Sequence, residues 1–361
     1  YVESVRQDPD DPELMFAGTS RTVYFSLDGG AQWQRLSLNL PAVRISDIEI
    51  QPRQHAVVLA TFGRAYWVLD NLQLLEQLGR TQVAATAPYL FQPQQAWLVS
   101  GGGGFGGRGN LGESLAPGAQ VFFHLPSDYD GSTPVKLSFT NSSGQLVNSY
   151  TLPLAPAPAG RSGRAIHIVK LHPGMNRFLW NMRYPSATEV KGIFRYAQQN
   201  GELVGPEVVP GTYQVTLSYG GFRQKQSLVI QLDPNLQTTP AELQQRFDLL
   251  MRLHRAANRL DINLNRAIDA RNALAKTAPA AARLDQDINS LVDLQIQAYE
   301  GSLVYPDLLR SWLWRISNRI DSSFLPPTSG MVQVANEYIQ QADAGVARLA
   351  ADLAAAPSTG R

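Results

Sequence analysis

The chain has 361 residues, which is too long for one ordinary hydrophobic core and predicts two or three domains. Hydrophobic residues make up 44% of it and no run approaches the roughly 20 apolar residues of a membrane span, which is typical of a soluble globular protein. The formal net charge of +1 gives no reason to expect a nucleic-acid partner, and the lack of cysteine excludes disulfides, thiolate nucleophiles and cysteine-ligated metals.

The first 75 residues predict short β-strands separated by turns, because apolar residues alternate or run briefly between Gly, Asp, Asn and Pro. The expected strands are Leu14–Gly18, Val23–Leu27, Trp33–Leu36, Ile45–Ile50, Val57–Thr61 and Tyr66–Leu69. Six strands correspond to about one and a half blades of a β-propeller. Because an incomplete propeller leaves open sheet edges, we expect the remaining blades upstream of Tyr1, or on another chain.

An S-x-D-x-G-x-x-W pattern, typical of an Asp-box, lies between the second and third of these strands. Its residues are Ser26, Asp28, Gly30 and Trp33. We expect the two polar side chains to bond the backbone of a tight turn and the glycine to supply a positive φ. Trp33 is expected to fold over the hairpin and pack into the layer behind it. The pattern therefore predicts a folding element and not a catalytic one.

Residues 76–117 predict a linker, with small and polar residues at Gly79–Pro88 and a short strand pair at Leu90–Phe91 and Ala96–Val99. A glycine-rich loop follows and fits G-x-G-x-x-G at Gly101, Gly103 and Gly106. No helix is expected after it to present its N-terminus to a pyrophosphate, so a flexible loop is favoured over a dinucleotide site. We expect no cofactor.

Residues 118–232 predict a second β region, an immunoglobulin-like or fibronectin-like antiparallel sandwich. Its seven expected strands are Gln120–Leu125, Val135–Thr140, Leu146–Leu152, Ala165–Val169, Asn176–Met182, Gly211–Tyr219 and Gln224–Gln231. Pro153–Pro158 and Gly160–Gly163 are expected to form a loop.

Residues 238–356 change to the helical period and predict an antiparallel bundle of four amphipathic helices. The first begins at Pro240, with Thr239 or Thr238 as its cap and Glu242 in its first turn. The other three are expected at Ala280–Tyr299, Pro306–Ser322 and Met331–Ala355. The third carries Trp312 on its apolar stripe and Trp314 off it.

Residue types that carry chemistry are scattered. The histidines His55, His124, His167, His172 and His254 have no zinc-ligand spacing, and we expect no metal. The candidate carboxylates are Asp8, Asp10, Asp11, Asp47, Glu49 and Asp70. Hydrolysis of a glycosidic bond needs two facing acids roughly 5 to 9 Å apart, and turn or surface roles are favoured for these residues. We expect no catalytic residue here.

The segment from Thr61 to Asp70 resembles the last blades of a bacterial family of BNR/Asp-box, sortilin-type propellers that are often labelled glycosyl hydrolases. The residues of this motif are Thr61, Gly63, Arg64, Trp67 and Asp70, and their role is unknown. The family usually has T-H-G-R-G where this chain has Phe62 and Ala65 in place of the His and the second Gly. Residues 173–181 and 209–213 are similar to the Ig-like module that follows in those proteins.

These observations predict a non-enzymatic extracytoplasmic module, periplasmic or extracellular, for binding or assembly within a larger complex. Its expected partners are the remaining blades and a protein or carbohydrate, with docking to a membrane-protein assembly as a further expectation. The alternative is the C-terminal part of a sialidase- or xyloglucanase-like glycoside hydrolase whose catalytic residues lie on upstream blades.

Overall fold

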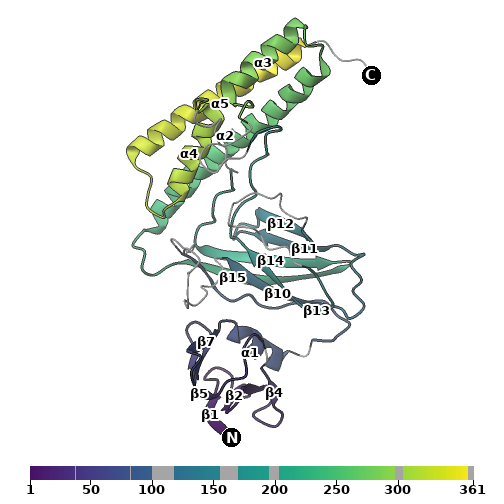
Figure 1. Cartoon of the computed structure of the whole chain (residues 1–361), viewed down its shortest axis with the longest axis vertical. Helices are drawn as coiled ribbons and strands as arrows, with labels where there is room; N and C mark the ends of the chain where they lie inside the picture. Colours follow the sequence, from purple (N-terminus) through teal and green to yellow (C-terminus); the bar gives the residue numbers. More distant parts are fainter. Residues whose placement is uncertain are drawn as a thin grey trace.

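A computed structural model describes residues 1–36, 38–81, 83–99, 118–154, 170–194, 203–296 and 304–356. It is a mixed β and α structure in which almost all strand pairs are antiparallel, in agreement with the expected class. Figure 1 shows two β regions and then a region of long helices in chain order. No helix within these described ranges is both long and apolar enough to cross a membrane.

The N-terminal β region consists of two antiparallel sheets. Its strands are β1 (Val2–Gln7), β2 (Met15–Thr19), β3 (Val23–Ser26), β4 (Gln34–Arg35), β5 (Ile45–Gln51), β6 (Ala56–Thr61) and β7 (Tyr66–Leu69). The sheet orders are β1-β2-β3-β4 and β5-β6-β7. The six expected strands are confirmed, and β1 is an additional one. The sheets approach closely at Gly18, where an added Cβ would lie 2.8 Å from Cγ2 of Ile45, so only glycine fits without a shift.

A short helix, α1 (Leu72–Arg80), follows β7 where a linker was expected to begin. Leu72 and Glu76 are the buried residues of this helix, and the Glu76 carboxylate lies 3.1 Å from Nδ1 of His55. The predicted linker is therefore wrong for residues 76–80. The apolar residues of this nine-residue helix lie on one face and cover the edge of the core.

The central β region contains two further sheets, ordered β13-β10-β8 and β12-β11-β14-β15-β9. The strands are β8 (Tyr89–Leu90), β9 (Ala96–Leu98), β10 (Ala119–Leu125), β11 (Val135–Thr140), β12 (Leu146–Leu152), β13 (Gly174–Trp180), β14 (Gly211–Tyr219) and β15 (Phe222–Leu232). The core is aromatic, with Phe139 stacked on Trp180 at a centroid distance of 4.0 Å. The expected strand Ala165–Val169 lies outside the described residues.

The expected pairing of the two short strands before the glycine-rich loop is wrong. β8 pairs with β10 in one sheet, and β9 pairs with β15 in the other as a parallel neighbour. Residues 89–98 thus belong to the central β region, and the expected boundary at 118 lies too late in the chain.

The helical region contains α2 (Pro240–Ala273), α3 (Pro279–Leu291), α4 (Leu309–Asp321) and α5 (Ser329–Ala355). The expected N-terminus of α2 is confirmed, since Thr239 and Glu242 form a reciprocal capping box. The second helix ends at Leu291, eight residues earlier than expected. α2 packs against the other three helices over a core of Leu and Ala side chains.

A buried ion-pair network joins the central β region to the helical region. Arg183, just after β13, donates to Asp321 at 2.8 Å and to the carbonyl of Gly205 at 3.0 Å. Asp321 ends α4 and also accepts from Arg246 of α2 at 3.0 Å, while Glu207 lies 3.8 Å from Arg183. Both arginine side chains are 4% exposed, so the charges are paired away from water.

Candidate interaction surface

The Asp-box residues form the turn that their spacing predicts. The buried Ser26 hydroxyl donates to Asp28 Oδ1 at 2.7 Å and accepts the amide of Gly30 at 2.9 Å. Asp28 in turn accepts the amide of Gln32 at 2.8 Å, and this bond is the main reason that the pKa of Asp28 lies below its usual value. Gly30 has a φ of +95°. These contacts all close the β3–β4 turn, so the motif has a folding role.

Trp33 does not occupy the position expected of it. Its indole lies over Gly30 and remains 40% exposed. The expectation that it packs into a layer behind the hairpin is wrong, because β4 is a two-residue edge strand with both residues exposed. Trp33 therefore covers its own turn.

We expect Ser26→Ala to lower the free energy of unfolding by about 1–3 kcal/mol, since it leaves buried polar groups unpaired. The measurement is urea denaturation, with the exposed Ser20→Ala as the matched control and a change near zero expected there. Equal effects of the two substitutions would contradict a folding role for the Asp-box.

The 61–70 motif forms the β6–β7 hairpin. The Thr61 hydroxyl donates to the carbonyl of Ala65 at 2.6 Å, and Gly63 turns the chain with a φ of +84°. Trp67 donates its indole N–H to the carbonyl of Arg64 at 3.1 Å and packs its ring against the N-terminal core. Burial raises the pKa of Asp70, which ends the hairpin. The motif residues thus hold the hairpin together.

The outer face of this hairpin is apolar. Val58 lies opposite Val68, and Ala60 lies opposite Tyr66, on the side of the sheet that faces away from the core. Tyr66 is 75% exposed, Val68 is 54% exposed, and Phe62 at the hairpin tip is also exposed. We call these five residues the β6–β7 outer face. Val58 and Ala60 of this set are half-buried.

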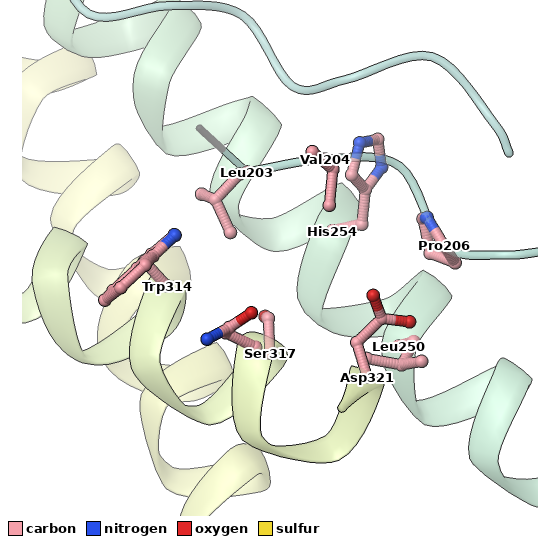
Figure 2. Close-up of a pocket in the computed structure, with 9 residues that line it drawn as sticks. Leu203, Val204, Pro206, Leu250, His254, Trp314, Ser317 and Asp321 are labelled. Carbon is pink, nitrogen blue, oxygen red and sulfur yellow. The ribbon is translucent and has the colours of Figure 1, made fainter. Parts of the chain in front are cut away.

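The other candidate, a small cavity between α2, α4 and residues 203–206, is shown in Figure 2. Nε2 of His254 and Oγ of Ser317 are buried there, and neither has a hydrogen-bond partner among the described residues. Burial lowers the pKa of His254, so this imidazole is neutral at pH 7. The cavity measures about 30 Å³, which fits a water molecule bridging polar walls and not a substrate.

Two tryptophans on α4 exchange the roles expected of them. Trp314 lines the cavity in Figure 2 and packs against the helical core. Trp312 is 41% exposed, and Leu313 takes the core position instead. The prediction that Trp312 lies on the buried stripe is wrong, because the buried position of α4 is Leu313, one residue later.

The carboxylates and histidines lie in separate environments. Asp8 Oδ1 accepts the amides of Asp10 and Asp11 at 2.7 and 3.0 Å, which is a turn role, and Asp47 pairs with Arg6 at 2.9 Å. Within the described ranges, no group of three or more His, Cys, Asp or Glu side chains gathers as a metal site would require. His167 and the three glycines Gly101, Gly103 and Gly106 lie outside the described residues.

Comparison with known proteins adds no assignment. No protein-family model matches the chain, and neither does any curated protein sequence.

Proposed function

We propose that this chain is a non-enzymatic module for binding or assembly, in the periplasm or outside the cell. Its N-terminal sheets would be the last blades of a β-propeller, followed by an Ig-like sandwich and an antiparallel helical bundle. The motif spacing supports this proposal, and so does Ala65, whose φ of +56° is the left-handed backbone that the second glycine of T-H-G-R-G would accommodate.

The observation that carries the proposal is that the β6–β7 hairpin is apolar on both faces, whereas the outer face of the neighbouring strand β5 carries Asp47 and Glu49. Val57 and Leu59 are buried on the inner face, while Val58, Tyr66 and Val68 form part of the outer face. A sheet with apolar side chains on both faces belongs between two other layers, and an uncovered apolar face marks an interaction site. We infer that another sheet covers it.

The partner that fits this surface is a further blade of the same propeller, on the same polypeptide or on another chain. Edge strand β7 also presents unpaired backbone groups next to the β6–β7 outer face. Attachment of the completed assembly to a membrane protein is part of the same proposal.

Without that partner, we expect the purified chain to self-associate through the β6–β7 outer face. Tyr66→Lys/Val68→Lys places two charges there and should raise the dissociation constant of self-association about tenfold or more. Sedimentation velocity over a concentration series measures this. The control is Val304→Lys/Leu325→Lys, which charges two apolar residues of the helical region that are at least as exposed and should leave association unchanged.

Two results would count against the proposal. One is a wild-type chain that remains monomeric at its highest soluble concentration. The other is turnover of a panel of polysaccharides by the chain together with its partner blades, which would favour the glycoside hydrolase alternative.

A further inference from the structure

Four residues of α2 lie in one row along the helix: Gln244, Phe247, Met251 and Arg255. Their spacing of three and four residues places them on one face. This row lines a cleft of about 610 Å³ between α2 and the central β region. Clefts of this size at the junction of two structural regions are typical small-ligand sites.

The walls of the cleft combine flat aromatic rings with amide groups. The Tyr184 and Phe247 rings are half-buried, with centroids 5.6 Å apart at an angle of 45°. Tyr213 is buried at the start of β14, where its hydroxyl donates to the carbonyl of Val209 at 2.7 Å. Gln145, from the turn between β11 and β12, and Gln244 supply amides to the same cleft. Rings present apolar faces, and amides can both donate to and accept from hydroxyl groups.

The cleft also has a cation, the exposed Arg255, on its lining. Arg255 forms no ion pair with a described residue, and none of the described lining residues is Asp or Glu. The neighbouring arginines of α2 point elsewhere: Arg252 donates to Asn336 of α5 at 2.7 Å, and Arg259 pairs with Asp343 of α5 at 2.6 Å. Arg255 and Tyr184 line the same cleft, and the positive charge of Arg255 partly offsets the rise that burial causes in the pKa of Tyr184. An anion is the complement of such a site.

We propose that this cleft binds an acidic saccharide, with the sugar carboxylate on Arg255, a ring face against Phe247 and Tyr184, and hydroxyl groups on the amides. A peptide fits less well. A peptide that binds by strand addition would need a free strand edge, and β14 is paired on both sides, by β11 and by β15. The proposal goes beyond the assembly function and uses none of the residues of the β6–β7 outer face.

The test is isothermal titration of the purified chain with trigalacturonate. We expect saturable binding that weakens about tenfold with Arg255→Gln, because a charge-assisted bond is lost. Phe247→Leu should weaken binding as well, because it removes the ring and keeps an apolar side chain. Arg252→Gln is the matched control and should bind as the wild type does. Unchanged near-ultraviolet circular dichroism verifies that each variant is folded.

Several results would overturn the proposal. These are no binding of trigalacturonate, equal binding of neutral maltotriose, or the same affinity in the folded Arg255→Gln and wild-type chains. Tighter binding of hexaglutamate than of trigalacturonate would replace the saccharide by an acidic peptide. The Tyr66→Lys/Val68→Lys variant should bind trigalacturonate normally, which separates this test from that of the assembly function.

Discussion

Asp321→Asn is expected to lower the free energy of unfolding by about 3–5 kcal/mol, because it leaves two buried arginines without their shared counter-ion. Arg183 would keep the carboxylate of Glu207, at 3.8 Å, and the neutral carbonyl of Gly205, at 3.0 Å. Arg246 would keep the carbonyl of Ile320, at 3.2 Å, which is a neutral partner. Burial already lowers the pKa of Arg246, and the negative charge of Asp321 opposes this effect. Urea denaturation measures the loss.

The matched control is Asp343→Asn, which breaks the ion pair with Arg259 on the surface of the same helical region. Both side chains of that pair are more than half exposed. Exposed pairs contribute up to about 1 kcal/mol. Because the Asp321 network joins the two regions, its loss should also separate a single unfolding transition into two. Equal losses from the two substitutions would contradict the network's structural role.

A second large effect is expected at Asp261, which is fully buried between α2 and α4. Arg310 Nη2 lies 3.4 Å from its Oδ2. Asp261→Leu alone should cost about 3–5 kcal/mol, since Arg310 would keep a buried charge without this counter-ion. Asp261→Leu/Arg310→Met should recover most of that loss, because apolar residues of similar volume replace both charges. A double variant as unstable as the single one would show that the pair is needed for folding.

The same pair makes stability depend on pH. Burial raises the pKa of Asp261 from 3.8 to about 6, with Arg310 opposing the rise. The folded state therefore holds the proton more tightly than the unfolded state does. The stabilisation that comes from this raised pKa is complete below pH 3.8. It falls as the pH rises from 3.8 through 6 and is absent at higher pH. The difference in pKa corresponds to roughly 3 kcal/mol.

The measurement is the wild-type unfolding free energy at pH 4.5 and pH 7, compared with that of Asp261→Leu/Arg310→Met. Carboxylates such as Asp28, Asp47 and Glu242 have lowered pKa values and act in the opposite direction, but they are common to both proteins. The difference between the two proteins isolates Asp261. Parallel pH profiles would contradict the assignment.

Features that depend on neighbouring residues could be predicted from the sequence. The capping box of Thr239 and Glu242 and the Asp-box bonds of Ser26 are both closed within a few residues. The partners of β8 and β9 could not be predicted, because their strands lie far along the chain and leave no trace in the local pattern. α1 was missed for a related reason. A helix of nine residues is short, and the core that Leu72 covers comes from distant strands.

The candidate sites could likewise be predicted only in the parts that depend on neighbouring residues. The hairpin motif from Thr61 to Asp70 was visible as a motif, but the outer face needed the register of β6 against β7. The row from Gln244 to Arg255 has helical spacing, yet nothing local shows that a sheet lies opposite it. The predicted burial of Trp33 was wrong for the same reason, because an aromatic residue at a turn is buried only if a layer lies behind it.

The split of residues 89–98 between two sheets also affects the order in which the chain can fold. The Leu90 amide donates to Oε1 of Gln224, 134 residues later, and the parallel neighbour of β9 begins its pairing at Ile230. During synthesis on the ribosome, β8 is followed fairly soon by its partner β10, whereas β9 emerges long before β15 does. Contacts of such sequence separation are slow to form. β9 is therefore among the last strands of the central β region to pair, and the nascent chain carries it unpaired until β15 has left the exit tunnel.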